Sequence, residues 1–62
     1  MNFISVANIK YVDSENFEEV RGYDDLTVQT NCFIFQWFES QQTLVIPMHR
    51  IDYLTTSQEE DS

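Results

Sequence analysis

The sequence has little of what usually stabilises a very small protein. Its 62 residues include one cysteine (Cys32), one histidine (His49), one glycine (Gly22) and one proline. A chain of this length buries only about 60 % of the surface that its unfolded form exposes. One cysteine excludes an intrachain disulfide, and one Cys with one His cannot form a structural zinc site of four ligands. A well-packed aromatic core, self-association, or both are therefore expected to stabilise the fold.

Basic residues are equally scarce. Lys10, Arg21 and Arg50 stand against 11 acidic residues, and the net charge is -8. Phosphate backbones and anionic membrane surfaces repel such a chain, so we expect neither direct nucleic-acid binding nor membrane binding. A protein partner with a basic surface is expected instead. The alternative interpretation is that the charge serves only solubility.

Long apolar runs are absent from the sequence. No stretch approaches the ~20 residues that span a bilayer. The beginning of the chain lacks the basic region and apolar core of a secretory signal, and no asparagine begins a glycosylation sequon. These features predict a cytoplasmic protein in a reducing compartment.

What the sequence does contain is β-sheet patterning. Aromatic residues make up 15 % of the chain, which is typical of a folded domain. Runs rich in β-branched and aromatic residues predict strands, and they cover residues 3–12 (with a bulge near 7–8), 26–38, 43–46 and 51–55. A polar loop at 39–42 suits a hairpin. We expect one β domain over residues 1–56, followed by a disordered acidic tail over 57–62, which has no apolar residue.

An acidic segment separates the first two predicted strands. It carries six carboxylates, namely Asp13, Glu15, Glu18, Glu19, Asp24 and Asp25. The segment suits either a single helical turn near 14–20, capped by Asp13 or Ser14, or an edge strand from Phe17 to Val20 with charges that oppose further pairing. A calcium loop does not fit, because Phe17 and Glu18 occupy positions that need an oxygen ligand and a glycine.

The segment 26–38 alternates, and its two faces differ. One face carries Leu26, Val28, Thr30, Cys32 and Ile34, and we expect it to belong to the core. The other becomes apolar only with Phe33, Phe35 and Trp37. These three rings are interpreted either as core or as a protein interface, since aromatic residues often anchor interfaces.

The last third of the chain reads as a strand, a tight turn at Met48-His49-Arg50 after Pro47, and a short final strand. This ending resembles the last two strands of small SH3-like and Sm-like barrels. The expected fold is therefore all-β, either a small curled antiparallel sheet or an SH3-like or Sm-like barrel of four to five strands. RNA binding does not carry over from that resemblance, because this chain lacks the basic loops. Residues 4–12 and 46–54 also share an Ile-x-Tyr-apolar pattern, either as a repeat or by chance.

No set of residues predicts catalysis. His49 and Asp52 are three positions apart, but nothing in the sequence supplies a reacting group. Cys32 has no neighbouring cation to lower its pKa and suits a core position. We predict no catalytic residue, no cofactor and no metal.

The expected function is that of a non-enzymatic protein-binding module. In size and composition the chain resembles phage-encoded inhibitors and DNA mimics, which implies that it occupies a basic surface of a nucleic-acid-binding protein. The candidate binding residues are the six carboxylates and three rings, Asp13, Glu15, Glu18, Glu19, Asp24, Asp25, Phe33, Phe35 and Trp37. The alternative is a homo-oligomeric structural or assembly protein, joined through the ring face.

Overall fold

The computed structural model describes residues 2–61, and of Asp61 only the backbone. It contains six strands and one short 3₁₀ helix, β1 (Asn2–Tyr11), β2 (Phe17–Arg21), β3 (Asp25–Val28), β4 (Cys32–Trp37), β5 (Gln42–Pro47), η1 (Met48–Arg50) and β6 (Ile51–Asp61). The prediction of an all-β fold is confirmed, with six strands instead of four to five. The tight turn after Pro47 is present as η1.

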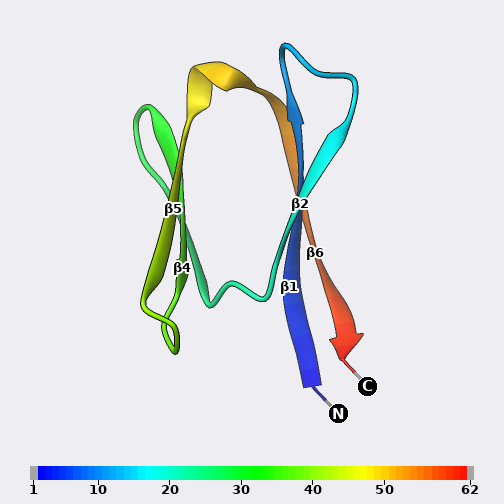
Figure 1. Ribbon diagram of the computed structural model, residues 1–62, viewed down its shortest axis with the longest axis vertical. Helices are drawn as coiled ribbons and strands as arrows, with labels where there is room; N and C mark the ends of the chain where they lie inside the picture. The colour runs from blue at the N-terminus through cyan, green and yellow to red at the C-terminus, as the bar shows by residue number, and fades with distance from the viewer. Residues whose placement is uncertain (1, 62) are drawn as a thin grey trace.

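The strands form two antiparallel sheets of three strands each, in the orders β2-β1-β6 and β3-β4-β5. The sheets face one another, with β4 and β5 on one side of Figure 1 and β1, β2 and β6 on the other. Tyr23 and Phe35 meet edge to face between them, with ring centroids 5.0 Å apart. The buried cluster draws on both sheets and consists of Ala7, Ile9, Val20, Tyr23, Phe35 and Ile46.

A short bent segment carries the chain from the first sheet to the second. At its start, Gly22 adopts a positive φ of 73°, and its N–H donates to the Ser5 carbonyl of β1 at 2.8 Å. Two residues later, the Asp24 N–H donates to the Gln36 carbonyl of β4, also at 2.8 Å. The backbone therefore pairs with one sheet just before the bend and with the other just after it.

The bend connects β2 to β3 on one side, and η1 connects β5 to β6 on the other. Within residues 2–61 no hydrogen-bonded ladder connects β5 to β6 on the other side, so the sheets remain open. The all-β class that the resemblance to SH3-like and Sm-like barrels implies is thus confirmed. Residues 2–61 do not close into a barrel.

Gly22→Ala is expected to destabilise the protein by roughly 1 kcal/mol, because an L-residue in the left-handed region costs about that much. A β-carbon at this position would lie 4.0 Å from Trp37 Nε1, so the penalty comes from the backbone and not from a clash. Urea unfolding measures the effect. Gln41→Gly is the matched control, since Gln41 also has a positive φ (56°), and this change is expected to stabilise. If both variants shift the unfolding midpoint equally and in the same direction, the positive φ of Gly22 is not the cause of the penalty.

The helical turn predicted near 14–20 is absent. The Asn16 N–H donates to Ser14 Oγ at 3.1 Å, which forms a polar turn, and β2 begins at Phe17. From Lys10↔Phe17 to Val6↔Arg21, β2 pairs with β1. The ladder supplies the backbone partners that a helical turn would otherwise provide, so the edge-strand alternative is the correct one.

The two faces of the segment 26–38 also differ from the prediction. This segment is a hairpin, closed where the Gln29 N–H donates to the Cys32 carbonyl at 2.9 Å. Across the hairpin, Leu26 pairs with Phe35 and Val28 with Phe33. The closing pair Gln29–Cys32 leaves a loop of two residues, Thr30-Asn31. Because this number is even, the core face changes from even positions in β3 to odd positions in β4. Phe33, Phe35 and Trp37 therefore face the core. The prediction that Cys32 and Ile34 lie on the core face was wrong.

The C-terminal residues form a strand where the sequence predicts a disordered tail. β6 continues to Asp61 and pairs with β1 from Val6↔Ser57 to Asn2↔Asp61. A neighbouring strand supplies backbone hydrogen bonds that the local composition cannot reveal. Ser62 lies outside the described residues.

Two smaller predictions concern β1. The bulge lies at Lys10/Tyr11 instead of near 7–8. There β6 has one extra residue, Asp52, between the partners of Lys10 and Tyr11. Residues 4–11 run along one strand, β1, and Val12 begins the turn after it, whereas 46–54 span the end of β5, η1 and the start of β6. The sequence similarity between these two segments is therefore not a structural repeat.

Candidate protein-binding surface

The predicted carboxylates lie at two separate ends of the molecule. Asp13 and Glu15 are in the β1–β2 turn, at the top of Figure 1, and Glu18 follows them early in β2. Asp24 and Asp25 are in and just after the bend at the lower end. Three extended steps along β2 separate Glu18 from Arg21, about 10 Å, and Asp24 lies beyond the bend, where its N–H bonds to the other sheet. The six carboxylates therefore do not form one patch.

All three cations of the chain are occupied within the protein. Lys10 Nζ lies 4.0 Å from Asp52, and the Arg50 guanidinium lies over the Tyr11 ring, 5.4 Å from its centroid. Arg21 Nη1 bridges Glu19 on β2 and Glu59 on β6. The hydrogen bonds that Arg21 donates, first to Glu19 and then to Glu59, raise the pKa of Arg21, so its guanidinium remains charged.

The other carboxylates have no such partner. Within residues 2–61, no cation lies within 4.0 Å of seven of them, Asp13, Glu15, Glu18, Asp24, Asp25, Glu39 and Glu60. Asp24, Asp25 and Glu39 come from the lower end, in the bend, at the start of β3 and in the β4–β5 turn. The surface field of the protein is therefore negative at both ends.

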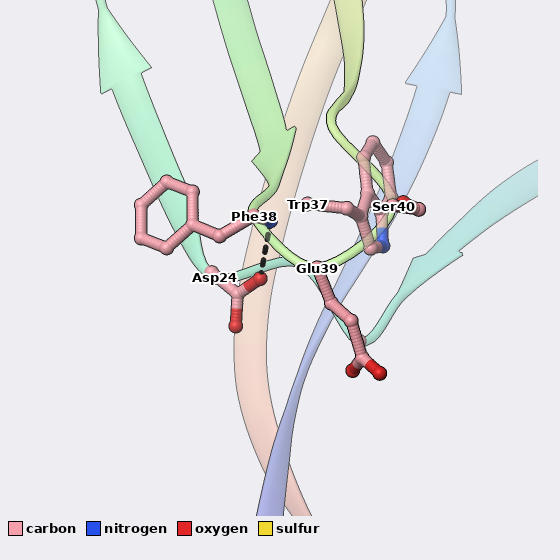
Figure 2. A pocket seen from close by; sticks show the side chains of 6 residues that line it. Asp24, Trp37, Phe38, Glu39 and Ser40 are labelled. Atoms are coloured by element: carbon pink, nitrogen blue, oxygen red, sulfur yellow. Dashed lines mark hydrogen bonds between the residues drawn. The ribbon is translucent and has the colours of Figure 1, made fainter.

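The lower end contains an acidic depression, lined by Gly22, Asp24, Trp37, Phe38, Glu39 and Ser40. Its walls are fixed by hydrogen bonds. Asp24 Oδ2 accepts the Phe38 N–H at 2.7 Å, and Trp37 Nε1 donates to the Arg21 carbonyl at 3.0 Å. Figure 2 shows the Asp24 and Glu39 carboxylates extending to the same side of the β4–β5 turn.

This arrangement can receive a cation. Asp24 uses one oxygen for the turn and keeps a second oxygen for another donor. A carboxylate binds a guanidinium or an ammonium through strong charge-assisted hydrogen bonds, and an indole face adds a cation–π contribution. The depression therefore suits a lysine or arginine side chain from another molecule.

The structure places the three predicted rings inside. Phe35 is 0 % exposed, and Phe33 and Trp37 are partly buried and pack against the core cluster. Only Trp37 reaches the depression. As a set, the rings fill the space between the sheets and do not present an outer face.

A different aromatic pair is exposed, and the sequence analysis did not single it out. Phe17 of β2 and Tyr53 of β6 lie in edge-to-face contact on the outside of the first sheet, with centroids 5.7 Å apart. Both residues are register partners of Lys10 on the central strand. The two positions are 36 residues apart in sequence, so only the register of β1 with both neighbours reveals the pair.

Residues with chemistry of their own are not brought together. His49 lies in η1, and the Cys32 thiol is half-buried near Gln29. In the described part of the chain no group of three or more His, Cys, Asp or Glu side chains is placed to hold a metal ion. Burial, followed by the hydrogen bond to Glu18, raises the pKa of Tyr11, so its phenol stays protonated at neutral pH.

Residues 2–61 contain no helix with the length and apolar character needed to cross a membrane. Comparison with known proteins gave no relative, since no family model, curated protein or solved structure matches this chain. A function must therefore be argued from the surface itself.

Proposed function

We propose that this protein is a non-enzymatic acidic binding module of the cytoplasm that occupies a basic surface of a nucleic-acid-binding protein. The observation that supports this most directly is the distribution of charge. Lys10 and Arg21 are ion-paired within the fold and Arg50 lies over the Tyr11 ring, whereas carboxylates at both ends have no cation partner in residues 2–61. The surface available to a partner is thus more uniformly negative than the composition alone requires.

The shape of the molecule supports the same proposal. Its longest dimension is 36 Å, and the unpaired carboxylates lie toward the two ends of this axis (Figure 1). A protein that binds a nucleic acid presents lysine and arginine side chains spaced along the phosphate backbone. Separated negative groups on the two facing sheets can engage such a surface at two places, as a DNA mimic and inhibitor does.

Within this function, the acidic depression is the proposed anchor. Side chains near the centre of a contact contribute most when they are held in one geometry. Asp24 is held by the Phe38 N–H, and Trp37 by the Arg21 carbonyl. Assembly through Phe33, Phe35 and Trp37 is not retained, because Phe35 is fully buried.

Binding to the partner is expected to weaken steeply with salt and to be competed by duplex DNA. The tagged protein would be used at low salt to capture basic nucleic-acid-binding proteins, and the affinity for the captured protein measured between about 0.05 and 0.3 M salt, a range over which exposed charges become screened. A fall of tenfold or more is expected. No basic partner at low salt, or a captured partner that DNA does not displace, would overturn the proposal.

A matched pair of double variants locates the anchor. Asp24→Asn with Glu39→Gln removes two charges from the depression and keeps an oxygen for the Phe38 N–H. Asp13→Asn with Glu15→Gln removes two charges from the other end. The first pair is expected to weaken binding about tenfold more than the second, because a lost charge-assisted hydrogen bond costs about 1.5–3 kcal/mol. Equal losses would show that only net charge matters.

A further inference from the structure

The two open sheets have four edge strands, and three of them carry charged residues. β2 contains Glu18, Glu19 and Arg21, β3 contains Asp25, and β6 contains Asp52, Glu59, Glu60 and Asp61. Charged side chains on an edge oppose pairing with another strand. The edge strand β5 (Gln42–Pro47) has no charged residue. It is thus the edge that lacks this protection.

The hydrogen bonding of β5 shows which of its backbone groups face outward. The Met48 N–H donates to the Asn31 carbonyl at 2.8 Å, and the register then pairs Ile46 with Phe33 and Leu44 with Phe35. In an antiparallel ladder, hydrogen-bonded pairs alternate with pairs that are not hydrogen-bonded. Leu44 and Ile46 therefore bond to β4, and the intervening residues direct N–H and C=O away from it.

The outward groups belong to Thr43, Val45 and Pro47. Pro47 has no N–H, which costs the β4–β5 ladder nothing at this position. Thr43 and Val45 each present one donor and one acceptor, and no partner for either is found within residues 2–61. The side chain of Val45 is 54 % exposed, beside half-buried Ile34 on the outer face of the sheet.

We propose that two copies of this chain pair antiparallel through β5, about a two-fold axis at Leu44. In this register Thr43 of each copy lies opposite Val45 of the other, and the N–H and C=O groups of both residues form four hydrogen bonds. The β3-β4-β5 sheets of the two copies then become one sheet of six strands. This goes beyond the proposed function and does not depend on it.

A second copy fits this edge for two reasons. The donors and acceptors of Thr43 and Val45 match themselves under two-fold symmetry, as an isologous contact requires. Two chains of charge -8 also approach each other with least repulsion where no charged side chain lies at the contact. An edge of six residues buries far less than the ~1,600 Å² of a standard interface. The dimer is therefore weak and concentration-dependent.

The dependence on salt separates this inference from the proposed function. Screening reduces the repulsion between two chains of the same charge, so salt strengthens the dimer. The same screening weakens binding to a basic partner. Each proposal can therefore fail without the other.

Sedimentation equilibrium of the full chain tests the inference from roughly 10 µM to about 1 mM, the range in which weak association becomes visible. The average mass is expected to rise toward twice that of the monomer, and to do so at lower concentration in about 0.5 M salt than in about 0.05 M salt. A monomer throughout this range in high salt would overturn the proposal.

Val45→Lys places a charge on the β5 edge and is expected to weaken the dimer at least tenfold. Thr27→Lys is the matched control, because Thr27 is exposed on the same sheet face but belongs to the other edge strand, β3. Its dimer is expected to be unchanged. If both variants weaken association equally, the contact is elsewhere. Should Val45→Lys not fold, a synthetic chain N-methylated at Val45 removes one outward donor without adding charge, and a dimer of normal strength would then reject the proposal.

Discussion

Phe35→Ala is expected to leave most of the protein unfolded at room temperature. Phe35 is 0 % exposed, meets the Tyr23 ring edge to face, and lies between Leu26 and Leu44 in the middle of its sheet. Replacing a buried phenylalanine by alanine costs about 3–5 kcal/mol. A core of this size rarely supplies more than about 3–5 kcal/mol of net stability. The substitution therefore removes the whole margin.

Urea unfolding followed by circular dichroism measures the loss. Phe38→Ala is the matched control, because it removes the same atoms from a ring that is 64 % exposed. Its unfolding midpoint is expected to stay close to that of the parent protein. A Phe35→Ala variant that keeps a cooperative transition near the parent midpoint would show that the sheets do not pack around this ring.

The strands around Pro47 could be predicted because their signals are local. Alternation in residues 43–46 marks a strand, Pro47 ends it, and the turn and final strand follow directly. The faces of the hairpin could not be predicted in the same way. Thr30 and Asn31 continue the even–odd alternation of the residues before them, so the pattern reads as one strand through 26–38. The change of core face comes from the two-residue loop Thr30-Asn31, and only the pairing of Leu26 with Phe35 reveals it.

The candidate site shows the same limit. The carboxylates and the absence of basic residues are visible in the sequence, and they support the class of partner. Their positions depend on the bend at Gly22 and on the β4–β5 turn, which bring Asp24 and Glu39 together across 15 positions of sequence. The contact between Phe17 and Tyr53 likewise depends on β1 lying between two strands. Such nonlocal pairing is set by register, which residue type alone does not specify.

Deleting residues 57–62 is expected to lower the melting temperature by about 10 °C or more. The deletion removes the partners of β1 from Asn2 to Val6 and leaves buried Val6 beside an empty strand position. Net backbone hydrogen bonds contribute about 1 kcal/mol each, and discounting for exposure leaves a loss of about 2 kcal/mol for this half of the ladder. For a domain of this size, each 1 kcal/mol shifts the melting temperature by about 4–8 °C.

The deletion also removes three carboxylates, so charge must be controlled separately. A full-length variant with Glu59→Gln, Glu60→Gln and Asp61→Asn removes the same charges and keeps the strand. Its melting temperature is expected to stay near that of the parent, because an exposed ion pair such as Arg21–Glu59 contributes little and the relief of repulsion acts in the opposite direction. If the shortened chain has the same melting temperature as this variant, residues 57–61 add nothing to the stability of the sheet and behave as the tail that their composition predicts. A deleted chain that melts well below it shows that backbone pairing with β1 stabilises a segment that has no apolar side chain.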